Sequence, residues 1–82
     1  MRAQTKMTRS LWAAATAMAF GAELLEVRPT GYGEALFCLD DTEGLATRGI
    51  DTWYRRTAVA NVADVAGNIY RLKEAARKAS EE

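Results

Sequence analysis

Apolar residues recur at helical spacing in two long stretches of the chain. In the first stretch they stand three or four positions apart, at Met7, Leu11, Ala14, Met18, Ala22 and Leu25. This spacing puts them on one face and predicts a helix over residues 5–26. Thr5 or Thr8 is the expected N-cap. Pro29 is the expected stop, because the residue before a proline is pushed out of the α region.

The second stretch lies near the C-terminus. Its apolar positions alternate by four and three residues, at Ala58, Val62, Val65, Ile69, Leu72, Ala76 and Ala79. Such a heptad pattern is typical of the contact between two packed helices, and it predicts an amphipathic helix over residues 51–79. Asp51 or Thr52 is the expected N-cap. Gly67 and Asn68 mark an expected weak point in this helix.

The segment between these stretches, residues 27–50, follows no single period. Pro29-Thr30-Gly31 is a turn signal, and the apolar residues on either side of it are consistent with two short strands. One helical turn is equally consistent with the second of these runs, so the sequence leaves strand or helix open for residues 32–40. The rest of the segment, from Asp40 to Gly49, is acidic and glycine-containing and is expected to be a loop.

Together these patterns predict a mainly α fold in a single small domain, residues 1–82. Because the two apolar stripes share a similar spacing, the simplest arrangement is an antiparallel hairpin of the two helices. Residues 27–50 would then form a short acidic connector, irregular or β-hairpin-like, across one end.

The first predicted helix is unusual because Leu11 to Ala22 is apolar on nearly every side, with Thr16 as the polar break. Such a helix needs cover all round, so we expect it to insert into a partner, a second copy or a membrane. The uncharged run from Ser10 to Ala22 is shorter than the ~20 residues of a membrane span, which leaves a short anchor open. The basic, acid-free start, residues 1–22, also resembles a secretory signal or an organelle transit peptide.

The chain has 82 residues, one cysteine and no histidine. An internal disulfide is therefore excluded, and a zinc site lacks its usual ligands. Because so short a chain buries only a modest core, we expect a protein partner, self-association or a membrane to support the fold. No cofactor is expected.

Eleven basic and eleven acidic residues cancel overall. They are unevenly spread, with net charges of +3 over residues 1–22, −5 over residues 23–51 and +2 over residues 52–82. These blocks either attract one another or are recognised by a partner. Nucleic acid is not the expected ligand of a neutral chain, although Arg55 and Arg56 beside two aromatic residues make a modest case for it.

Tests for catalytic and metal-binding motifs fail. Gly31 and Gly33 lack the third glycine and the lysine of phosphate-binding loops. The acidic loop that starts at Asp40 has Leu45 where a calcium loop requires glycine. Cys38 has no histidine to activate it and lies in an apolar run, where a cysteine is usually a small buried hydrophobe. We therefore expect no enzyme, no metal and no small-molecule substrate.

These observations favour a non-catalytic protein–protein interaction module, or a subunit of a larger assembly, that binds through its helical apolar faces. The candidate partner-binding residues are Leu11, Trp12, Met18, Phe20, Asp40, Asp41, Val62, Val65, Ile69 and Leu72. One alternative is an accessory subunit of a membrane complex, with the first helix embedded. Another is a small regulator or inhibitor of the phage type, docking on a larger enzyme through its acidic middle segment. The location is left open between soluble intracellular, membrane-associated and organelle-targeted.

Overall fold

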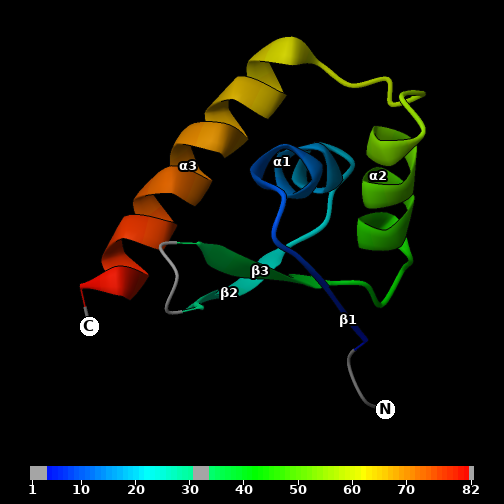
Figure 1. Ribbon diagram of the computed structural model, residues 1–82. Coiled ribbons are helices and arrows are strands. Elements are labelled where there is room, and N and C mark those ends of the chain that lie inside the picture. The colour runs from blue at the N-terminus through cyan, green and yellow to red at the C-terminus, as the bar shows by residue number, and fades with distance from the viewer. Residues whose placement is uncertain (1–3, 31–33, 82) are drawn as a thin grey trace.

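The computed structural model, which describes residues 4–30 and 34–81, has two layers rather than two helices (Figure 1). Three helices lie on one face of a three-stranded antiparallel sheet of strand order β1-β3-β2. The elements in chain order are β1 (Thr5–Thr8), α1 (Leu11–Ala19), β2 (Leu24–Pro29), β3 (Ala35–Asp40), α2 (Leu45–Tyr54) and α3 (Val62–Ser80). The predicted mainly α fold, a two-helix antiparallel hairpin, is therefore wrong.

The predicted helix over residues 5–26 begins as a strand. Residues Thr5–Thr8 pair with β3, and Met7 lies opposite Cys38. Two β-branched threonines suit a strand better than a helix, and β3 offers them an edge to pair with. The N-cap of α1 is Ser10, whose side chain accepts a hydrogen bond of 3.1 Å from the Ala13 N–H.

The first helix also ends earlier than predicted. The N–H of Ala22 donates to the Ala17 carbonyl at 3.0 Å, and the N–H of Gly21 donates to the Met18 carbonyl at 3.0 Å. This pair of bonds is the Schellman motif, which needs a left-handed residue after the helix. Gly21 supplies it with a φ of 111°. The apolar residues beyond this cap therefore belong to the run into β2.

The connector contains a β-hairpin followed by a helix. Strands β2 and β3 pair antiparallel with Val27 opposite Phe37, so the strand alternative is the one found for the residues from Ala35 onward. The pairing contains an irregularity between Leu24 and Glu26. Of the predicted turn Pro29-Thr30-Gly31, Pro29 is the last residue of β2, and Gly31 lies outside the described residues, which leave out 31–33.

The acidic loop predicted up to Gly49 is wrong in its second half, where α2 runs. Ala46, Gly49 and Ile50 are its buried residues, and they form the stripe that packs against α1. Glycine inside a helix costs ~1 kcal/mol relative to alanine. A Cβ on Gly49 would lie 2.4 Å from the Ala17 Cα, so the close crossing of the two helices requires glycine here.

The predicted helix over residues 51–79 is two helices. Residue Thr52, expected as an N-cap, lies inside α2. That helix ends in a second Schellman motif: the Arg56 N–H donates to the Trp53 carbonyl at 3.0 Å, and the Thr57 N–H donates to the Thr52 carbonyl at 2.9 Å. Arg56 takes the left-handed position, with a φ of 59°.

Helix α3 starts at Val62 and continues without a break through the expected weak point. Its N-cap is Asn61, whose side chain accepts a hydrogen bond of 3.1 Å from the Asp64 N–H. Asn68 is buried and donates from its side-chain amide to the Ala15 carbonyl at 3.1 Å. A polar residue is thereby satisfied inside the contact between α1 and α3.

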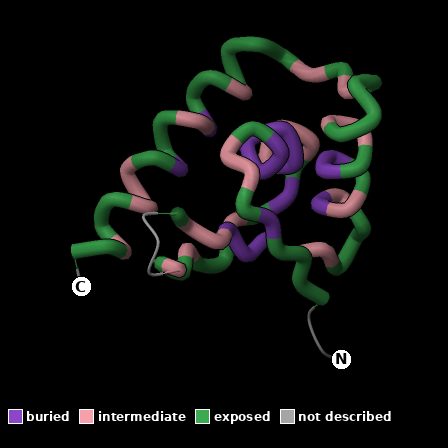
Figure 2. The backbone as a smooth tube through the Cα atoms, viewed as in Figure 1, coloured by how far each residue is buried: buried purple, intermediate pink, exposed green. Residues whose placement is uncertain are grey.

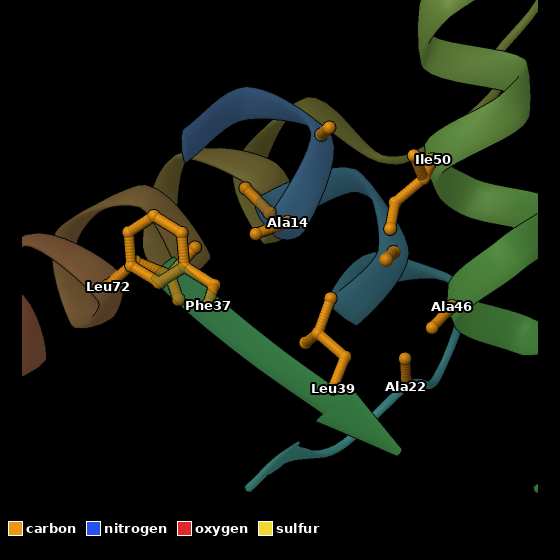
Figure 3. Close-up of a cluster of buried hydrophobic side chains, with 10 residues drawn as sticks. Ala14, Ala22, Phe37, Leu39, Ala46, Ile50 and Leu72 are labelled. Atoms are coloured by element: carbon orange, nitrogen blue, oxygen red, sulfur yellow. The ribbon is translucent and has the colours of Figure 1, made fainter. Parts of the chain in front are cut away.

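The core lies between α1 and the sheet. Phe37 and Leu39 of β3 point toward α1, while Ile50 of α2 and Leu72 of α3 close the sides (Figure 3). Residues Ala13–Ala17 are all buried, as the purple course of α1 shows (Figure 2). The cover that the sequence demanded for this helix is therefore supplied by the chain's own sheet and helices.

Candidate binding cleft

An apolar cleft opens where the start of α1, the end of α2 and the start of α3 meet. The segment that joins α2 to α3 passes at the top of Figure 1 and forms part of its wall. The cleft has a volume of about 260 Å³. Its lining residues are Trp12, Thr16, Trp53, Ala58, Ala60, Val62, Val65 and Ala66.

The lining suits an apolar guest. None of the lining residues is charged. Apart from the two tryptophans, the lining residues are aliphatic except for Thr16. The Thr16 hydroxyl already donates to the Trp12 carbonyl at 2.9 Å. A cavity of ~150 Å³ admits a benzene molecule, so this cleft has room for one large aromatic or aliphatic side chain.

Two stacked tryptophans form one wall of the cleft. The ring centroids of Trp12 and Trp53 are 5.9 Å apart, and the rings are inclined by 10°. Helices α1 and α2 cross each other, and Gly49 meets Ala17 and Trp53 meets Trp12 where they cross. The second residue of α1 is thereby placed on the last turn of α2. Trp12 remains 52% exposed.

Exposed apolar residues lie at the margin of the cleft and next to it. Val62, the first residue of α3, is 81% exposed, and Val59 in the connecting segment is 88% exposed. A second hollow shares Trp53 and Ala58 with the cleft, and its other lining residues are Tyr54 and Arg56. Large aromatic residues together with arginine are the side chains most enriched at the centres of protein interfaces.

Three of the candidate residues from the sequence come together here. Trp12, Val62 and Val65 all line the cleft. Leu11 and Met18 instead pack against the core.

The other candidates lie elsewhere. Phe20 is the half-buried C-cap of α1. Ile69 packs against the core, and Leu72 is a fully buried part of it. Most of the heptad stripe is thus used inside the chain. Asp40 and Asp41 lie at the end of β3, where the acidic turn leads into α2.

Sequence reasoning missed the contribution of Trp53, which it placed at the start of a helix. Trp53 continues the helical spacing of Ala46 and Ile50. That signal was available, but Gly49 within the same stretch favoured a loop. The wall formed by Ala58 and Ala60 had no local signal, because only the path of the connecting segment brings these residues to the cleft.

The acidic turn has a structural role. The Asp40 carboxylate accepts hydrogen bonds from the side chain and backbone N–H of Thr42, which hold its pKa below the ordinary value. The Asp41 carboxylate accepts bonds from the N–H and hydroxyl of Thr47, in the first turn of α2. Burial raises the pKa of Asp41, but these hydrogen bonds and the charge of Lys6 outweigh it, so the pKa lies below the ordinary value.

Cys38 is 3% exposed and lies on the face of the sheet opposite the helices, since Phe37 and Leu39 on either side of it face α1. In the part of the chain that the structure describes, no group of three or more Cys, Asp or Glu residues is arranged to hold a metal ion. Of the described helices, none combines the length and apolar character that a bilayer crossing requires.

No family model, curated protein or solved structure matches the chain. What the cleft can bind therefore follows from its own geometry and residues.

Proposed function

We propose that the protein is a small, non-catalytic protein–protein interaction module that takes an apolar side chain of its partner between Trp12, Trp53 and Val62. The observation that carries this proposal is an uncharged cleft of about 260 Å³ walled by two stacked tryptophans, of which Trp12 is 52% exposed. A concave apolar site next to exposed aromatic residues is where a partner's anchoring side chain gains most from leaving water.

The two alternatives have weaker support in the geometry. The membrane-subunit hypothesis started from the all-round apolar helix, and residues Ala13–Ala17 of that helix are covered by the chain itself. The regulator hypothesis needs free carboxylates in the acidic middle segment. Those of Asp40 and Asp41 already accept hydrogen bonds from Thr42 and Thr47, which lowers what they gain from a partner.

The test is selection of peptides from a randomised, tryptophan-free phage-displayed library on the immobilised full chain. Trp12 and Trp53 are the two tryptophans of the protein, so their fluorescence reports on the cleft when each selected peptide is titrated. We expect the selected peptides to share one large apolar residue and to change this fluorescence.

The Val62→Asp variant places a carboxylate at an exposed position of the cleft without opening the core. We expect it to abolish binding, because the guest would bury that charge. Tyr70→Asp is the matched control, as Tyr70 is exposed on the same helix and does not line the cleft. Failure to select any peptide, or equal binding by the Val62→Asp variant, would refute the proposal.

A further inference from the structure

Two arginines follow one another at the end of α2, and Arg56 lines the hollow that adjoins the cleft. Residues 52–62, which end α2 and lead into α3, carry Arg55 and Arg56 and no acidic residue. Both side chains are exposed. The ion pairs within the described residues join Arg28 to Glu26 and Arg77 to two glutamates, and leave Arg55 and Arg56 out.

The position of Arg56 is unexpected for an arginine. Helices α1 and α2 end in the same Schellman motif, and α1 uses glycine at the left-handed position whereas α2 uses Arg56. Among the residues that the structure describes, Arg56 is the non-glycine residue with positive φ. Glycine fits such a position without steric cost. A long cationic side chain thus stands at a position where the helix cap alone would favour glycine.

The side chain of Arg56 lies next to the proposed binding cleft. It lines the hollow that shares Trp53 and Ala58 with the cleft. A ligand that fills the cleft and continues along the same surface therefore passes from uncharged walls to a cationic margin.

We infer that the partner is an acidic peptide segment, which places an apolar side chain in the cleft and a neighbouring carboxylate on Arg56 and Arg55. This inference rests on the proposed function and adds the chemistry of the partner. An arginine guanidinium matches a carboxylate through two parallel hydrogen bonds, and such charge-assisted bonds are stronger than neutral ones. Charge complementarity also speeds the encounter and excludes basic partners.

Single-stranded nucleic acid is the other ligand that combines negative charge with flat apolar groups. It binds by stacking bases on exposed aromatic faces. Trp12 and Trp53 already stack on each other, which occupies one face of each ring, and the chain as a whole is neutral. The geometry therefore favours the peptide, and oligothymidylate serves as the competing probe.

The test uses peptides selected from the tryptophan-free library on the wild-type chain. We expect aspartate or glutamate beside the apolar anchor. Replacing those acids by amides should weaken binding about tenfold or more. Raising the salt concentration should weaken the binding of the acidic peptide and leave the binding of its amide version nearly unchanged.

Variants of the protein locate the effect. Arg56→Gly should raise the melting temperature by roughly 2–8 °C, because glycine adopts the left-handed conformation without steric strain. The same variant should bind the acidic peptide about tenfold more weakly. Arg55→Gln should weaken it as well. Arg71→Gln removes one exposed arginine of α3 that lines a separate hollow together with Met18 and Asp64, and it should leave the affinity unchanged.

The outcomes separate the two levels of the hypothesis. Selected peptides without acids, or peptides that tolerate acid-to-amide replacement and Arg56→Gly, overturn the acidic partner and leave the interaction module standing. Tighter binding of oligothymidylate than of every selected peptide also overturns the acidic partner. The interaction module and its acidic partner are both refuted if no peptide is selected, or if Val62→Asp leaves peptide binding unchanged.

Discussion

Single residues decide how closely the helices approach. Gly49 and Gly67 both lie inside helices, yet their surroundings differ completely. A Cβ on Gly49 would lie 2.4 Å from the Ala17 Cα, a backbone atom that cannot move away by itself. A Cβ on Gly67 would meet nothing within 4 Å. From the sequence the two glycines look alike, because the neighbour that distinguishes them is on another helix.

Alanine at these two positions should therefore act in opposite directions. We expect Gly49→Ala to lower the free energy of unfolding by about 3 kcal/mol, since it forces α1 and α2 apart. Gly67→Ala should raise it by ~1 kcal/mol through helix propensity. Urea denaturation of both variants measures this. A mild effect of Gly49→Ala would show that the helices can separate without loss of packing.

At the scale of elements, end signals decide where helices begin and stop. Asp41 shows how an acidic residue can resemble a ligand while acting as a cap. Its carboxylate accepts a 2.9 Å hydrogen bond from the Thr47 N–H, one of the free donors in the first turn of α2. Gly44, at the N-cap itself, has no side chain to do this. The cap is thus supplied from three residues further upstream.

Asp41→Asn should lower the free energy of unfolding at neutral pH by at most about 1 kcal/mol, because the amide oxygen still accepts from the Thr47 N–H while the charge and the second acceptor oxygen are lost. Because the folded pKa of Asp41 lies below its ordinary value of 3.8, the charged form contributes its full stabilisation above the unfolded pKa. That contribution is lost as the pH falls through the folded pKa. The variant should therefore lose stability less steeply in acid than the wild type does.

Asp51→Asn is the control for this pH dependence, since Asp51 is an exposed residue of the same helix. Thermal unfolding over a series of acidic pH values gives the comparison. An acid slope that is the same in the Asp41→Asn variant and in the wild type would remove Asp41 as a source of acid sensitivity.

At the scale of the whole molecule, few large side chains hold the two layers together. Leu39 and Leu72 are the largest fully buried side chains among the described residues, and much of the remaining core is alanine. Small domains have little stability to spare. Because much of the core is alanine, the few large buried side chains supply a large share of its packing energy.

Leu72→Ala should accordingly lower the free energy of unfolding by ~2–5 kcal/mol, a large part of a typical total. Lys73→Ala, at the next and exposed position of α3, should change it by less than about 0.5 kcal/mol. Urea denaturation with an unchanged m-value would confirm that both variants unfold from the same compact state. Similar losses in the two variants would contradict the placement of α3 on the core.

The sequence by itself determined the features that depend on neighbouring residues. Val65, Ile69 and Leu72 pack inward as their helical spacing predicts, although Val62 of the same stripe is 81% exposed, and Cys38 is buried. For residues 32–40 the sequence left strand or helix open, and the structure shows a strand from Ala35 onward. Only the tertiary structure decided that Thr5–Thr8 form a strand, since that strand needs the edge of β3, which lies more than a helix and a strand further along the chain. It also overrode the loop signal of Gly49 in α2, against which the helical spacing of Ala46, Ile50 and Trp53 was not decisive by itself, and it decided that Trp12 meets Trp53. Pairing of this kind is set by packing between distant segments, to which local propensity contributes little.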